Sequence, residues 1–164
     1  MENRAIMEKL SFEQFLGEID ANDRAFVQEL HHYLLDNGCK ATFEEKKTSL
    51  LGSYKYIKSK RSVINLLLKK QGLLVRIYGE NTGKYFDFLQ TLPEEMVQAI
   101  ARASECKRLV YNTCSPKCSG YDVTIGGDRY QKCKYGGFEF LVAERNNPSI
   151  KSFVVHEMRE RLTV

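Results

Sequence analysis

The chain has 164 residues, of which 43% are hydrophobic and 28% are charged. This composition is ordinary for a globular protein, and a chain of this length buries enough surface to fold without a disulfide or a metal. It excludes a membrane-spanning protein, because the longest apolar runs are only a few residues long and a bilayer needs about 20. The first ten residues are charged throughout and lack a signal-peptide core, so we expect a cytoplasmic protein with reduced cysteines.

Positive charge is concentrated in one part of the chain. The net charge is +4, but residues 40–76 hold ten basic and two acidic residues, whereas residues 1–39 hold three basic and eight acidic ones. Because the basic part has the pattern of strands, the sheet is expected to present an anion-attracting face.

Two helices are predicted at the start of the chain. Ser11 and Gln14 have the spacing of a capping box, in which each side chain bonds the other residue's backbone N–H, so a short helix should begin here. A second helix is predicted from about Asn22 to Asp36, because apolar residues repeat at helical spacing and Gly38 provides a left-handed stop.

An antiparallel meander is predicted next. Between residues 39 and 79 the apolar period changes to two, which indicates strands. Turns are expected at 58–61 and 69–72, and links this short force neighbouring strands to be antiparallel.

Helices and strands share the remainder of the chain. Helices are predicted at 85–89 and from Pro93 to about Ser104, and strands between 121 and 143. A final helix should begin near Asn147 with Pro148 at its first position. Its buried stripe is expected to contain Phe153, Val154, one of Glu157 and Met158, and finally Leu162.

These elements predict an α+β protein. We expect antiparallel sheets built from two units, each a strand hairpin followed by a helix, with the helices mainly on one face. Residues 1–164 are expected to form a single compact domain, with sub-units at 11–104 and 105–164.

The most distinctive stretch contains four of the five cysteines, in the spacing C-x7-C-x3-C-x14-C. Structural zinc takes four thiolate or imidazole ligands, often in pairs from tight turns such as the loop that holds Cys114 and Cys118. Cys106 ends a predicted helix and Cys133 lies on a returning strand, so both can approach that loop. Three states fit this spacing: a structural zinc site at all four cysteines, free thiols, or a disulfide.

A second candidate site is a basic hairpin, formed by Tyr54, Lys55, Tyr56, Lys58, Lys60 and Arg61. Interleaved rings and cations suit single-stranded nucleic acid, because bases stack on rings and phosphates bind cations. In strand geometry, however, the two tyrosines share one face and Lys55 lies on the other. Lysines at a sheet edge also have a simpler use, which is to prevent sheets from associating.

Known enzyme motifs are absent from the sequence. It contains no Walker A loop, no dinucleotide-binding glycine pattern, no nucleophile elbow and no zinc-protease motif. His31 and His32 are neighbours on a predicted helix and point about 100° apart, so they cannot share a metal as an i, i+4 pair can. No catalytic residue is predicted.

A family resemblance is carried by the cysteine stretch. The runs CKRL, CSPKCSGY and YQKCKY, together with the tyrosine-rich hairpin and the LPEEM helix start, resemble an uncharacterised family of short bacterial proteins. The resemblance implies a compact cytoplasmic domain of unknown function, and it transfers no activity and no catalytic residue.

We therefore expect a non-enzymatic binding or interaction protein whose cysteine cluster pins the loop at 112–120, with zinc as the candidate metal. One alternative is a protein that binds single-stranded nucleic acid, or another anionic ligand, through the basic hairpin. The other alternative is an enzyme with a pocket between sheet and helices.

Overall fold

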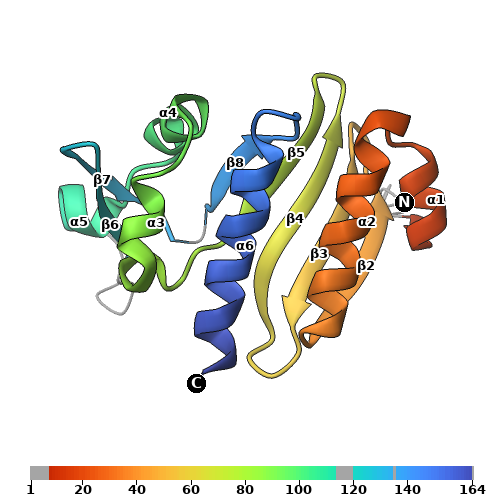
Figure 1. Ribbon diagram of the computed structural model, residues 1–164, viewed down its shortest axis with the longest axis horizontal. Helices are drawn as coiled ribbons and strands as arrows, with labels where there is room; N and C mark the ends of the chain where they lie inside the picture. Colours follow the sequence, from red (N-terminus) through yellow and green to blue (C-terminus); the bar gives the residue numbers. More distant parts are fainter. Residues whose placement is uncertain (1–7, 114–119, 135, 164) are drawn as a thin grey trace, which may run out of the picture.

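A computed structural model describes residues 8–113, 120–134 and 136–163. Within these residues, six strands form one antiparallel sheet in the order β1-β2-β3-β4-β5-β8, and β6 and β7 form a separate hairpin. Helices pack against the larger sheet (Figure 1). The α+β class predicted from the sequence is confirmed.

The larger sheet has a meander at its centre. Its strands are β1 (Glu8–Leu10), β2 (Cys39–Glu45), β3 (Leu50–Tyr56), β4 (Arg61–Lys69), β5 (Gly72–Ile77) and β8 (Phe138–Leu141). The β3–β4 and β4–β5 hairpins confirm the predicted antiparallel order. β1 was not expected from the sequence; it extends the sheet beyond β2, with Leu10 opposite Phe43.

Three helices flank this sheet: α1 (Phe12–Gly17), α2 (Ala21–Asp36) and α6 (Asn147–Leu162). The predicted capping box starts α1, because Ser11 Oγ accepts from Gln14 N at 3.1 Å and Gln14 Oε1 accepts from Ser11 N at 2.8 Å. Gly38 has the expected positive φ, +89°, just after α2. α2 and α6 lie across the same face of the sheet (Figure 1), as predicted.

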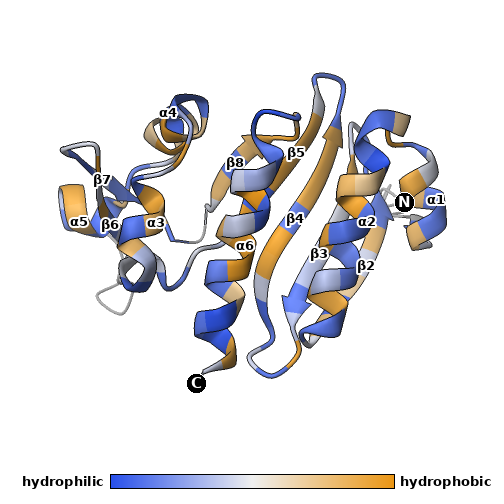
Figure 2. Ribbon diagram, in the orientation of Figure 1, coloured by the Kyte–Doolittle hydropathy of each residue, from blue (hydrophilic) through white to orange (hydrophobic). Residues whose placement is uncertain are grey.

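The core lies between that face and the two long helices. Alternate residues of each strand point toward the helices, and hydrophobic residues recur along β4 and β5 and on α2 and α6 (Figure 2). The fully buried side chains there include Phe15, Leu30, Leu34, Tyr54, Ile64, Leu66, Val75, Ile77, Phe140 and Phe153.

The chain between β5 and β8 leaves the sheet and forms a smaller group of elements, on the left in Figure 1. They are a 3-10 helix, η1 (Thr82–Tyr85), followed by α3 (Phe86–Leu89), α4 (Glu94–Arg102), α5 (Lys107–Tyr111), β6 (Tyr121–Ile125) and β7 (Asp128–Lys132). β8 does not continue the β6–β7 hairpin but pairs with β5. The physical reason is that Phe138 and Phe140 of β8 are buried beside Ile77 and Val75, and they complete the main core.

One part of the buried stripe on α6 differs from the prediction. Both Glu157 and Met158 are buried, and the stripe ends at Arg161, whereas Leu162 is 44% exposed. A charged residue replaces a leucine inside because Arg161 and Glu157 form an ion pair within the core. None of the described helices combines the length and apolar character that crossing a bilayer requires.

Candidate functional site

A short antiparallel bridge joins the residues before α5 to the end of β7. Cys106 N donates to Gln131 O at 3.0 Å, and Cys133 N donates to Ser104 O at 2.7 Å. The bridged pair is Glu105 and Lys132, and each cysteine directly follows one of these two residues. Residues in these positions are diagonal neighbours, and strand alternation places their side chains on the same face.

Gly120 brings the chain that enters β6 against Cys106. A Cβ atom on Gly120 would lie 2.6 Å from Cys106 Sγ and 3.0 Å from Leu109 Cδ1, and the φ of this glycine is +64°. Both the close approach and the backbone conformation require glycine. The Cys106 thiol is consequently enclosed, with only 3% of the residue exposed, whereas Cys133 is half-buried.

Cys114 and Cys118, the other two predicted ligands, lie outside the described residues. Among the residues that are described, no three histidine, cysteine, aspartate or glutamate side chains are grouped as metal ligands. The structure thus brings together Cys106 and Cys133, and the four-cysteine site stays a prediction.

The fifth cysteine, Cys39, is a core residue. Its Sγ lies 3.9 Å from the Met158 sulfur, on the face of the sheet that α6 covers. Burial raises the pKa of the Cys39 thiol to about 11, which favours the neutral thiol in the folded state.

The histidines are used for packing. The His31 ring stacks on Phe12 with 3.6 Å between centroids, and its Nδ1 shares a 2.8 Å hydrogen bond with the Tyr54 hydroxyl. Burial lowers the pKa of His31, which favours the neutral ring. His156 lies against Phe88, with 4.6 Å between centroids.

The basic hairpin does not present its rings to solvent. Tyr54 and Tyr56 are 0% and 8% exposed, because strand alternation places both on the face that the helices cover. Neither ring can stack on a base in this conformation, which corrects that part of the prediction. Lys55 is exposed on the opposite face, directly across from Lys40, and Lys60 is exposed in the turn with φ +61°.

Three of the predicted hairpin residues do share one pocket. Tyr56, Lys58 and Arg61 line a hollow of about 320 Å³. The other lining residues are Ser59, Glu80, Asn81 and Arg161. At this pocket Arg61 pairs with Glu80, with 3.2 Å between Nη1 and Oε1. This hollow is called the Arg161 pocket below.

A buried ion pair on α6 contributes one wall of the Arg161 pocket. Arg161 Nε donates to Glu157 Oε2 at 2.8 Å, and Arg161 Nη2 donates to the Tyr78 carbonyl oxygen at 2.7 Å. Glu157 also accepts from Asn81 N at 3.0 Å, from Asn81 Nδ2 at 2.9 Å and from the Tyr85 hydroxyl at 2.7 Å. Burial and the nearby carboxylate raise the pKa of Tyr85 far above its usual value, so its hydroxyl stays a donor.

Sequence reasoning missed this pair. A glutamate and an arginine four residues apart usually form a pair on the solvent-exposed surface of a helix. The one sequence feature that indicated burial of Glu157 was the apolar stripe that passes through its position.

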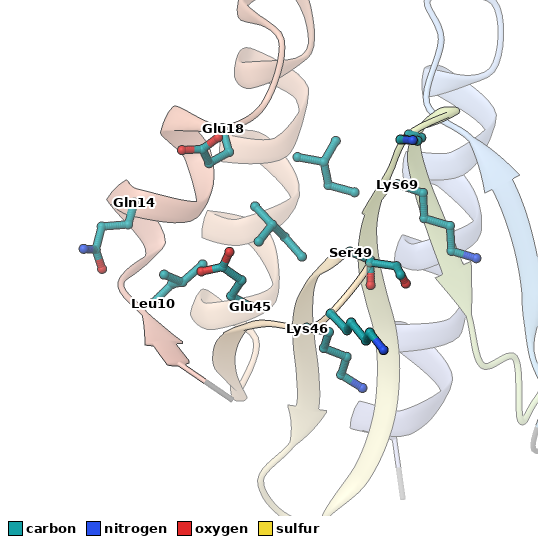
Figure 3. Close-up of a pocket in the computed structure, with 12 residues that line it drawn as sticks. Leu10, Gln14, Glu18, Glu45, Lys46, Ser49 and Lys69 are labelled. Carbon is teal, nitrogen blue, oxygen red and sulfur yellow. The ribbon is translucent and has the colours of Figure 1, made fainter. Parts of the chain in front are cut away.

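A larger hollow, about 880 Å³, lies at the other end of the sheet (Figure 3). Leu10, Leu50 and Leu68 line it together with Gln14 of α1 and Glu18 just after that helix. Lysines at two hairpin turns complete the lining, namely Lys46, Lys47, Lys69 and Lys70. Figure 3 shows the labelled Lys46 and Lys69 side chains extending away from α1. The positive charge of residues 40–76 is therefore divided between the two ends of the sheet and the face opposite α2, rather than gathered on one face as expected.

No protein-family model, no curated protein and no solved structure matched the chain in comparisons with known proteins. Functional inference therefore depends on the geometry described above.

Proposed function

We propose that this protein is a non-enzymatic binding protein in which a thiolate-bound zinc ion fastens the loop at 112–120. The observation that carries the proposal is the placement of Cys106 and Cys133 on one face of the bridge before α5, with Gly120 against the Cys106 thiol. Side chains at diagonal positions of paired strands are near neighbours, so these two thiols can supply half of a tetrahedral ligand set.

The other half of the ligand set would come from the loop. Cys118 precedes Gly120 by two residues in the sequence, and Gly120 is the residue that contacts Cys106. Cys114 belongs to the same segment, four residues before Cys118 in the sequence. Four thiolates and no other ligand type make a closed, structural zinc site rather than a catalytic one.

The surrounding elements would gain stability from a metal. α5 is five residues long and buries none of its residues, and helices this short are not stable by themselves. The β6–β7 hairpin buries Tyr121, Val123 and Ile125 but has only two strands, so a metal bond at its end would add to the stability that this packing supplies. A zinc ion would link both elements. Because the unfolded chain has no preformed ligand set, the free energy of zinc binding would stabilise the folded state.

The test is the metal content of the protein purified under reducing conditions. We expect about one zinc per chain, lost in Cys106→Ser, in Cys133→Ser and in the Cys114→Ser/Cys118→Ser double variant. Cys39→Ala is the matched control and should retain the metal, because Cys39 lies in the core of the larger sheet. A metal-free wild type whose melting temperature is unchanged by zinc or by a chelator would refute the site, and thiol titration of denatured protein then separates free thiols from a disulfide.

Binding of single-stranded nucleic acid is the second candidate function. Lys40 and Lys55 are exposed and lie directly opposite each other on the face of the sheet that α2 does not cover, and like charges in that position repel. A phosphate backbone would relieve this repulsion. The buried Tyr54 and Tyr56 supply no stacking, so affinity would depend on charge alone.

Fluorescence anisotropy with a labelled oligothymidine at several salt concentrations tests this second candidate. We expect affinity to fall steeply with salt, and each of Lys40→Gln and Lys55→Gln to reduce the slope of log affinity against log salt by about 0.7. Lys46→Gln, at the far end of the sheet, is the control. Affinity that does not change with salt, or no binding, would eliminate this function. No constellation of described residues supports the enzyme alternative.

A further inference from the structure

We propose that the Arg161 pocket is a binding site for an oxyanion group, a phosphate or a carboxylate, carried by a small molecule. The Arg161 pocket and the proposed zinc site have no residue in common, so each of the two proposals can fail without affecting the other. Three observations carry it: an unsatisfied buried guanidinium, a second arginine in the same pocket, and the size of the pocket.

Arg161 has hydrogen-bond donors that the protein leaves unused. Its side chain is only 4% exposed, and Nε and Nη2 bind Glu157 and the Tyr78 carbonyl oxygen. Nη1 is buried and has no hydrogen-bond partner among the residues that the structure describes. Buried polar groups in folded proteins are nearly always satisfied, and an unpaired donor on a charged group is especially costly. An acceptor that enters from outside would remove this cost.

The chemistry of the pocket selects an anionic acceptor. A guanidinium presents its donors in a planar fork, which matches the oxygens of phosphates and carboxylates. Arg61 lines the same pocket, and its pair with Glu80 is exposed enough to exchange partners, since 60% of the Arg61 side chain is accessible. Asn81 adds an amide side chain to the lining.

The pocket also restricts the size of the ligand. Its volume of about 320 Å³ is at the lower end of the range of small-molecule sites. Nη1 itself has almost no exposed surface, so an oxygen reaches it only after a small side-chain adjustment in the pocket wall. Glu80 would repel a bare anion that displaced Arg61, so a ligand with a hydroxyl beside its anionic group suits this site best.

Titration of the full chain with inorganic phosphate and with acetate, followed by ¹⁵N–¹H NMR, tests the proposal. Sodium chloride at matched ionic strength is the reference. We expect saturable shifts of the Arg161 Nε–H and Asn81 N–H signals with at least one of the two oxyanions and not with chloride. Stronger binding of phosphate would indicate a phosphate ester as the natural ligand, and stronger binding of acetate would indicate a carboxylate.

Two arginine variants make the test specific. Arg61→Gln removes one cation from the pocket and should weaken oxyanion binding about tenfold, because it removes a charge-assisted contact. Arg145→Gln is the matched control, since Arg145 is similarly exposed, at 63%, and pairs with Glu95 away from the pocket. Shifts that do not saturate, that chloride reproduces, or that Arg61→Gln and Arg145→Gln change equally would overturn the proposal.

Discussion

Replacing Glu157 with glutamine tests the interior of the molecule most directly. Glu157 is fully buried, and its two oxygens accept hydrogen bonds from Arg161, from Tyr85 and from both nitrogens of Asn81. The substitution hardly changes the volume of the side chain. It removes the negative charge, however, and it places an amide donor where the protein already presents donors, so Arg161 becomes a buried cation without a counter-ion.

The expected loss is large for a single substitution. Removing one partner of a buried ion pair costs about 3–5 kcal/mol of unfolding free energy. In a chain of this length, that loss lowers the melting temperature by about 6–20 °C. The matched control is Glu95→Gln, which breaks the solvent-exposed pair with Arg145 and should lower the stability far less than Glu157→Gln does.

Urea unfolding followed by circular dichroism measures both variants, and a double-mutant cycle isolates the interaction. Glu157→Leu combined with Arg161→Met leaves no uncompensated charge, so the double variant should lose less than the sum of the two single losses. If Glu157→Gln costs no more than Glu95→Gln, the inference that Glu157 and Arg161 form a stabilising ion pair inside the core is wrong.

Three further predictions concern other parts of the fold. The unfolding free energy should fall as the pH drops below about 6.5, because burial lowers the pKa of His31 and the unfolded chain then binds a proton that the folded chain excludes. His31→Phe should flatten this part of a stability profile measured by urea unfolding at each pH. Gly52→Ala should cost about 1–3 kcal/mol in thermal unfolding, because its Cβ would lie 2.9 Å from the packed Phe43 ring, and an unchanged melting temperature would show that the ring can move. Lys132→Met should cost about 1–3 kcal/mol and speed hydrogen exchange at the end of α4, since Lys132 Nζ binds two carbonyl oxygens there, and unaltered exchange would contradict this role.

Local signals in the sequence determined much of this fold. The capping box at Ser11 and the left-handed glycine at position 38 were predicted correctly, as were the two hairpins of the meander. Each depends on a few neighbouring residues whose conformational preferences agree. The sequence also predicted that Cys106 and Cys133 approach each other, and the backbone bridge at Glu105 and Lys132 places their two segments side by side, whereas the four-cysteine site stays a prediction.

Partners that are distant in the sequence were decided only by the tertiary structure. Strand alternation showed that Tyr54 and Tyr56 share a face, but not that α2 and α6 cover that face. The pattern of β8 was equally compatible with pairing to β7, and burial of Phe138 and Phe140 in the main core decided in favour of β5. Glu157 and Arg161 have the spacing of a surface pair, and the position of α6 on the sheet placed them inside. A residue's periodicity specifies its direction along one element, whereas its exposure depends on what packs against that element. The Arg161 pocket exists only because residues of the hairpin, of the segment just before η1 and of α6 meet there.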